Sequence, residues 1–267
     1  MGEVIAITNQ KGGVGKTTTS VNLAASLSAI KRKVLLIDMD PQGNATMGCG
    51  IDKKALERTV CDVLLDGLNI EECVQTQDRM RIDVLPSNAD LTAAEVELLG
   101  AERRERRLRD ALANVREKYD YILIDCPPSL NMLTLNSMVA ADGVLIPMQC
   151  EYYALEGLTA LIDTIEQIRS TINPRLRIEG LLRTMYDARN NLAGDVSTQL
   201  IEHFGDRVYR TVVPRNVRLA EAPSHGLPVL LYDKTSRGAL AYLALAGEIV
   251  RHQVQRVSAS NQAKATI

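Results

Sequence analysis

The sequence contains no tryptophan and a single phenylalanine among its 267 residues, so aromatic side chains make up only 3% of the chain. Base stacking on aromatic rings is therefore a poor candidate for any contact with nucleic acid. No uninterrupted run of about 18 apolar residues is present, which excludes a membrane-spanning helix. Residues 1–10 also lack the basic stretch and the small-residue cleavage site of a secretory signal. We therefore expect a cytoplasmic protein with no membrane partner.

Cysteine and histidine are scarce and are not spaced as metal ligands. There are three histidines and no C-x-x-C pair, and the five cysteines are Cys49, Cys61, Cys73, Cys126 and Cys150. We expect these to be thiols without disulfide bonds, as in a reducing compartment. Because 46% of the residues are hydrophobic but few are aromatic, the core must consist of Ile, Leu, Val, Ala and Met. This composition suits a parallel sheet that is covered on both faces.

Apolar runs of strand length alternate with longer segments of helical period. Several runs, such as VLLID, YILID and GVLIPM, are continuous apolar blocks, which is typical of strands buried on both faces. The order of strands and helices predicts an α/β fold with a doubly wound, mostly parallel sheet and helices on both faces. The expected strands are Glu3–Thr8, Lys33–Asp38, Arg81–Pro86, Tyr119–Cys126, Gly143–Met148, Arg177–Met185, Val208–Val212 and Leu227–Leu231. The expected helices include Lys16–Ile30, Ala93–Lys118, Leu155–Thr171, Ala193–Phe204 and Ala239–Gln255. We expect one domain over residues 1–257 and a disordered tail over residues 258–267.

A glycine-rich loop follows the first expected strand and opens the first expected helix. This context is what a nucleoside triphosphate site requires, because glycines let the backbone amides surround the phosphates at a helix N-terminus. Lys16 would supply a charge for the β and γ phosphates, and the Thr17 hydroxyl would bind Mg²⁺. The expected nucleotide contacts are Lys11, Gly12, Gly13, Val14, Gly15, Lys16, Thr17 and Thr18. The chain is therefore expected to be a P-loop ATPase, and the absence of an N-K-x-D motif favours ATP over GTP.

The loop departs from the usual G-x-x-x-x-G-K-[ST] pattern at its first position. Gln10 stands where glycine is expected, and an additional lysine, Lys11, follows it.

Three carboxylates lie at the ends of apolar strands. Asp125 ends the strand YILID and is expected to hold Mg²⁺, although an aspartate at a strand end also forms turns. Asp38 and Asp40 end the second strand, where residues two apart point to the same face. We expect Asp38 to assist the metal shell and Asp40 to orient the attacking water, and the alternative is a turn at the end of the strand.

Charge is unevenly distributed although the net charge is only −2. Residues 183–237 contain 8 basic and 6 acidic side chains, and residues 238–267 contain 3 basic and 1 acidic. The last third of the chain is therefore mildly basic, which is compatible with contact to an anionic partner.

The string KGGVGKTTT resembles the deviant Walker A motif of the MinD/ParA group of P-loop ATPases. The segment DMDPQGN after the second strand resembles the D-x-D-P-Q-G-N signature of ParA/Soj chromosome-partitioning ATPases. DCPPS, VPRN and EAPSHG match further motifs of these proteins, and the resemblance extends over residues 1–252.

This resemblance implies an ATP-dependent dimer whose subunits face each other across two nucleotides. Lys11 would reach the partner's phosphates, and Gly12 would have to stay small where the two loops approach. Lys11, Lys16 and Asp40 would be the catalytic residues. Pro214 and Asn216 match positions that frame adenine.

The resemblance also implies non-specific binding to double-stranded DNA. The candidate DNA contacts are Arg189, Arg215, Arg218, Lys234 and Arg237, of which Arg189 and Arg218 match the family best. Since no helix-turn-helix is apparent, binding should be sensitive to salt and insensitive to sequence. A ParB-type centromere-binding protein would stimulate hydrolysis, and the protein would be nucleoid-associated and would separate chromosome origins.

Three alternatives stay open. A MinD-like ATPase would need a membrane-binding amphipathic helix near the C-terminus. A reductase-type relative would need cysteine ligands for an iron–sulfur cluster, for which only Cys126 is suitably placed. An ATPase of the same fold could also position another cargo.

Overall fold

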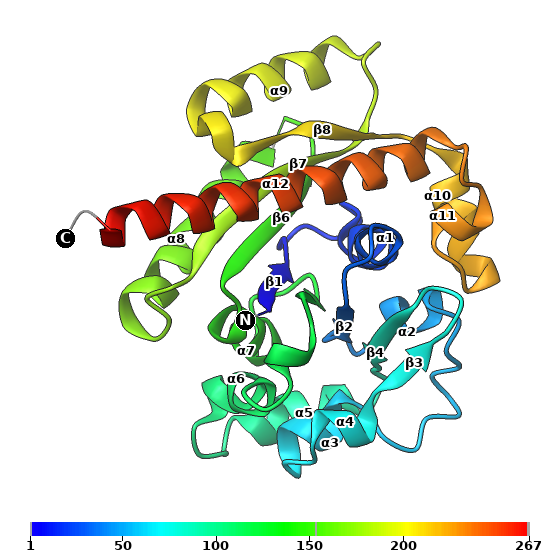
Figure 1. Ribbon diagram of the computed structural model, residues 1–267, viewed down its shortest axis with the longest axis vertical. Helices are drawn as coiled ribbons and strands as arrows, with labels where there is room; N and C mark the ends of the chain where they lie inside the picture. Colours follow the sequence, from blue (N-terminus) through cyan, green and yellow to red (C-terminus); the bar gives the residue numbers. More distant parts are fainter. Residues whose placement is uncertain (1, 153, 266–267) are drawn as a thin grey trace.

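The computed structural model describes residues 2–152 and 154–265. The strands are β1 (Glu3–Ile7), β2 (Val34–Asp38), β3 (Gln75–Gln77), β4 (Ile82–Leu85), β5 (Tyr121–Asp125), β6 (Gly143–Gln149), β7 (Arg177–Tyr186) and β8 (Val208–Pro214). They form one sheet in the order β3-β4-β2-β5-β1-β6-β7-β8 (Figure 1). Neighbouring strands are parallel except β3 and β4, which pair antiparallel. The predicted doubly wound, mostly parallel fold is confirmed.

Helices cover both faces of this sheet. The α-helices are α1 (Lys16–Ala29), α2 (Asn44–Gly48), α3 (Val60–Leu65), α4 (Ile70–Cys73), α5 (Leu91–Leu98), α6 (Arg107–Leu112), α7 (Met132–Ala140), α8 (Ala154–Thr171), α9 (Asn191–Phe204), α10 (Val217–Glu221), α11 (Val229–Tyr232) and α12 (Arg237–Ala265). Short 3₁₀ helices are η1 (Arg104–Arg106), η2 (Arg116–Lys118), η3 (Gly205–Arg207) and η4 (Ala222–His225). Alternation along β1 sends Val4 and Ala6 to the core that includes α3 to α9. Ile5 and Ile7 join the opposite core, with α1, α2 and α10 to α12.

The predicted strand over Leu227–Leu231 is wrong, because this segment forms the single-turn helix α11. Pro228 directly precedes the helix, and its carbonyl accepts a hydrogen bond of 3.1 Å from the Tyr232 amide. The Val229 amide donates to Asn22 Oδ1 of α1 at 2.7 Å. A short apolar run looks alike in a buried strand and a buried helix, so its pattern could not distinguish the two.

The single helix predicted over Ala93–Lys118 is divided into α5, η1, α6 and η2. Gly100 follows α5, and Arg103 adopts a positive φ of 53°, which no continuous helix allows. The short strand β3 was not predicted, since its sequence QTQ carries no apolar signal.

The segment predicted to be a disordered tail from residue 258 is helical as far as Ala265, because α12 continues through it. Neither glycine nor proline, the strongest helix breakers, occurs between Arg256 and Ala265, so the sequence allows the helix to continue there. Residues 266 and 267 lie outside the described residues. Across the described ranges no helix is both long and apolar enough to cross a membrane.

The edge strand β8 bulges where it pairs with β7. Leu181 pairs with Val208, but Arg183, only two residues later, pairs with Val212. The guanidinium of Arg183 donates to the carbonyls of Tyr209 and Arg210 at 2.8 and 3.2 Å. The bulge thus leaves backbone groups without a strand partner, and a buried side chain binds its carbonyls.

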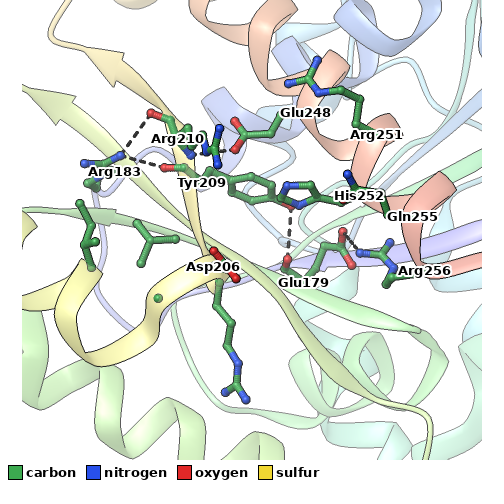
Figure 2. A pocket seen from close by; sticks show the side chains of 14 residues that line it. Glu179, Arg183, Asp206, Tyr209, Arg210, Glu248, Arg251, His252, Gln255 and Arg256 are labelled. Atoms are coloured by element: carbon green, nitrogen blue, oxygen red, sulfur yellow. Dashed lines mark hydrogen bonds and ion pairs between the residues drawn. The ribbon is translucent and has the colours of Figure 1, made fainter. Parts of the chain in front are cut away.

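Glu248 of α12 accepts hydrogen bonds from backbone amides of the same bulge. Its two carboxylate oxygens accept hydrogen bonds from the amides of Arg210 and Thr211 at 2.7 and 3.0 Å. Both side chains line a cavity of about 850 Å³ between β7, β8, η3 and α12 (Figure 2). Arg183 and Glu248 therefore provide hydrogen-bond partners for backbone groups of the bulge.

Replacing Glu248 should destabilise the fold. Glu248→Ala leaves two amides of β8 without their acceptors, and we expect a loss of about 1–3 kcal/mol in the free energy of unfolding. Gln255→Ala is the matched control, because Gln255 lines the same cavity from the same helix but is exposed. Urea unfolding of both variants measures the difference, and equal stabilities would contradict the role of Glu248.

Candidate nucleotide-binding site

The loop between β1 and α1 adopts the backbone that its glycines permit. Gly13 and Gly15 have φ values of 74° and 88°, where a side chain would be strained. On β7, Thr184 donates its hydroxyl to the carbonyl of Val14 at 2.7 Å and so attaches the loop to a distant strand. At Gly12, in contrast, a Cβ atom would meet no heavy atom of the described residues within 4 Å.

Lys16 extends across this loop. Its side chain is only 7% exposed, and Nζ donates to the carbonyl of Lys11 at 3.1 Å. Burial lowers the pKa of Lys16, and the nearby Asp125 and Asp40 oppose this shift. Among the described residues this carbonyl is the one acceptor of Lys16, so the buried ammonium keeps donors for phosphate oxygens.

Asp125 and Thr17 form the pair that was expected to hold a metal ion. Thr17 Oγ1 donates to Asp125 Oδ2 at 2.8 Å, and Ser20 Oγ donates to Oδ1 at 2.6 Å. Both Thr17 and Ser20 belong to α1, so the helix that follows the loop also orients the carboxylate of β5. A hydroxyl beside a carboxylate is the oxygen donor set that Mg²⁺ prefers, and the residues present fit such an ion.

Asp38 is engaged mainly with α2. Its Oδ2 accepts hydrogen bonds of 2.8 Å from both the amide and the hydroxyl of Thr46, and its Oδ1 accepts one of 3.1 Å from the Asp40 amide. Its expected part in the metal shell stays a prediction. The contact with Thr46 was not predicted, since a threonine eight residues away gives no pattern in the sequence.

Asp40 lies just beyond β2 and is 8% exposed. Its Oδ1 accepts a hydrogen bond from the Gln42 amide at 2.9 Å, and its carbonyl accepts one from the Ser87 hydroxyl at 2.9 Å. Its second carboxylate oxygen has no hydrogen bond among the described residues. Asp40 is thus fixed beside Asp38 and Lys16 with one oxygen available.

Asp38 and Asp125 are opposite each other in the sheet, where β2 and β5 pair in register. Burial raises the pKa of both carboxyl groups, and each is raised further by neighbouring aspartates. The pKa of Asp125 rises to about 8. Bringing a cation to this place would relieve the cost of burying two ionised carboxylates, as expected of a metal-assisted phosphate site.

Lys11 is placed differently from Lys16. Its ammonium forms an ion pair with Glu151, which follows β6, and the two side chains are 47% and 43% exposed. Glu151 was not predicted as part of the site, because 140 residues separate it from Lys11. The two lysines of the loop therefore have separate surroundings, one buried in the loop and one at the surface.

Pro214 and Asn216, predicted near adenine, lie at the end of β8 and the start of α10. Asn216 Oδ1 accepts a hydrogen bond of 3.3 Å from the Leu219 amide and so caps α10. In the described part of the chain, neither residue is hydrogen-bonded to the phosphate loop, so their adenine contact stays a prediction.

The predicted DNA contacts are spread over several elements. Arg189 is paired with Asp187, and Arg218 is paired with Glu221 and Asp233. The others have these places: Arg215 donates its amide to the Tyr186 carbonyl, Lys234 lines a surface hollow with Arg218, and Arg237 begins α12.

Cys126 does not resemble a cluster ligand. It is buried, and burial raises the pKa of its thiol to about 12. Among the described residues, no group of three or more His, Cys, Asp or Glu side chains is arranged to hold a metal ion.

The fold and the loop define a P-loop ATPase. The AAA domain family matches residues 2–178. The sporulation initiation inhibitor protein Soj of Bacillus subtilis is 54% identical and covers 93% of this chain and 98% of its own. The chromosome partitioning protein ParA of Myxococcus xanthus is 50% identical and covers 96% of this chain and 90% of its own. The chain belongs to the ParA/Soj family of chromosome-partitioning ATPases.

A solved structure gives the same result for the fold. The cobyrinic acid a,c-diamide synthase of Mycobacterium smegmatis, with a bound ATP analogue and magnesium, superposes with a TM-score of 0.83. It is 36% identical and covers 95% of this chain and 96% of its own.

The raised pKa of Asp125 predicts a pH-dependent stability. The carboxyl group of Asp125 stays protonated in the folded protein up to about pH 8, whereas in the unfolded chain it loses its proton near pH 4. The free energy of unfolding therefore decreases as the pH rises from about 4 to about 8. Asp125→Asn cannot ionise, and we expect it to reduce this fall by on the order of 2 kcal/mol. Thermal unfolding at pH 5 and pH 8 without nucleotide measures the effect.

Asp66→Asn is the control, because Asp66 is an exposed aspartate. A pH profile of Asp125→Asn that is parallel to the profile of the unaltered protein would contradict the assignment.

Proposed function

We propose that this chain binds ATP with Mg²⁺, dimerises around two nucleotides and then binds DNA without sequence preference. A ParB-type centromere-binding protein stimulates hydrolysis and releases the DNA, which separates chromosome origins on the nucleoid in the cytoplasm. The observation that carries this proposal is the arrangement of the two loop lysines, with Lys16 buried in the loop and Lys11 exposed at its entrance.

The nucleotide is held by the loop amides and by Lys16. Thr17 and Asp125 hold Mg²⁺, which neutralises charge on the phosphates when it is bound. The bound ATP analogue and magnesium in the M. smegmatis structure support binding of ATP with Mg²⁺ by this fold. Asp40 orients the attacking water through its available carboxylate oxygen. Its contribution is to position this water, because phosphoryl transfer needs little covalent chemistry from the protein.

The surroundings of Lys11 and Gly12 support the proposed dimer. Lys11 is exposed enough to reach a second molecule, and its charge would stabilise the partner's phosphates as an arginine finger does. Gly12 has open space beside its Cα, so no contact among the described residues of one subunit requires a glycine there. A close approach of a second loop would require one.

Enlarging Gly12 should separate dimerisation from folding. We expect Gly12→Val to leave thermal stability unchanged within about 0.5 kcal/mol, since a Cβ atom at this position meets no described neighbour. Dimerisation with a non-hydrolysable ATP analogue should be lost, because the second loop could not approach. Sedimentation velocity at micromolar protein measures this.

Gly100→Val is the control, since Gly100 is exposed and follows α5, which belongs to the opposite core from α1. A Gly12→Val protein that forms the dimer as readily as the control would contradict the proposed interface.

DNA binding rests on arginines that are already paired at the surface. The pairs of Arg189 and Arg218 are exposed, and such pairs contribute only about 0–1 kcal/mol each. DNA phosphates can therefore replace these carboxylates at low cost. Dimerisation doubles the number of arginines that face the DNA and raises affinity steeply, because each phosphate that is neutralised releases counterions.

Neutralising these arginines should weaken the salt dependence of DNA binding. An arginine that no longer neutralises its phosphate should decrease the slope of log affinity against log salt by about 0.9, and by twice that in a dimer. Arg189→Gln and Arg218→Gln test this by fluorescence anisotropy with an ATP analogue. Arg58→Gln is the control, because Arg58 forms a comparable exposed pair with Glu72. Slopes equal to that of the control would refute a role of these arginines in DNA binding.

A further inference from the structure

The ion pair of Lys11 with Glu151 joins two segments that other contacts also hold together. Asn9 Nδ2 donates to the carbonyl of Pro147 at 2.8 Å, and Asn9 Oδ1 accepts a hydrogen bond from the Lys11 amide at 3.0 Å. The Glu151 amide donates to the Gln149 carbonyl at 2.9 Å. Both residues of the pair are therefore placed by the backbone, next to each other at the ends of the neighbouring strands β1 and β6.

The side chain of Lys11 has one ammonium charge for two candidate partners. In the single protomer the ammonium of Lys11 forms an ion pair with Glu151. In the proposed dimer it would contact the partner's phosphates instead. The carboxylate and the phosphates compete for the same charge.

We propose that Glu151 is a positioning residue that holds Lys11 within its own protomer and so opposes dimerisation until a triphosphate is present. This inference rests on the dimer proposed above. The partner's triphosphate carries several negative charges and replaces the single carboxylate, so nucleotide binding releases the lysine where it is needed. A protomer facing a partner without triphosphate has no such competitor and keeps Lys11 on Glu151.

The expected strength of this restraint follows from its exposure. Exposed ion pairs are weak, so Glu151 raises the protein concentration needed for dimerisation but does not prevent dimerisation. Two pairs break for each dimer formed, and their removal should lower the protein concentration for half-dimerisation by roughly threefold to tenfold. Because salt screens exposed pairs, the difference should shrink as ionic strength rises.

Glu151→Gln tests this proposal in the full-length protein. Sedimentation equilibrium with Mg²⁺ and a non-hydrolysable ATP analogue at low salt gives the concentration for half-dimerisation. We expect Glu151→Gln to dimerise at lower concentration than the unaltered protein, and Glu151→Asp, which keeps the charge on a shorter side chain, to lie between them. Glu72→Gln is the matched control, since Glu72 forms an ion pair with Arg58 and is 44% exposed.

The direction in which Glu151→Gln shifts the concentration for half-dimerisation supports or overturns the proposal. If Glu151→Gln dimerises like the control, the ion pair does not restrain Lys11 and the proposal is wrong. If Glu151→Gln dimerises less readily, Glu151 supports the dimer itself, which also overturns the proposal. If the unaltered protein stays monomeric with the analogue, the proposed ATP-dependent dimer is wrong, and the proposed role of Glu151 is then wrong as well.

Discussion

The parallel register of β1, β2 and β5 is the constraint on which the rest of the site depends. Ile7 and Asp38 both pair with Asp125, so the phosphate loop and two carboxylates leave the sheet at one edge. Hydrophobic packing on both faces holds this register, because a shift by one residue would turn buried side chains of each strand to the wrong core. The chemistry of the site is thus positioned by apolar residues that take no part in it.

Burial then determines how each charged group behaves. Asp125 and Asp38 are buried together, which raises their pKa values and makes the place favourable for a cation. Lys16 is buried in the loop, whereas Lys11 is at the surface. The same residue type therefore has two environments in one loop, and we propose two roles: Lys16 for its own nucleotide and Lys11 for exchange between Glu151 and a partner's phosphates.

The sequence predicted the parts of the protein that local pattern determines. The phosphate loop, the strands that precede Asp38 and Asp125, and the two-faced sheet all follow from contiguous residues, and the structure has this fold. The segment Leu227–Leu231 was wrongly predicted because four or five apolar residues fit a strand and a buried helical turn equally well. Thr184 and Glu151 could not be found this way, since they reach the loop across 170 and 140 residues. Arg183 and Glu248 were missed for another reason, because they bind the backbone of a bulge that no periodicity reveals.

In the proposed dimer, two protomers share two triphosphates and each contributes Lys11 to its neighbour. The most direct test is sedimentation velocity of the unaltered protein at micromolar concentration, with Mg²⁺ and either ADP or a non-hydrolysable ATP analogue. We expect a monomer with ADP and a dimer with the analogue. A sedimentation coefficient that is the same with both nucleotides would contradict it.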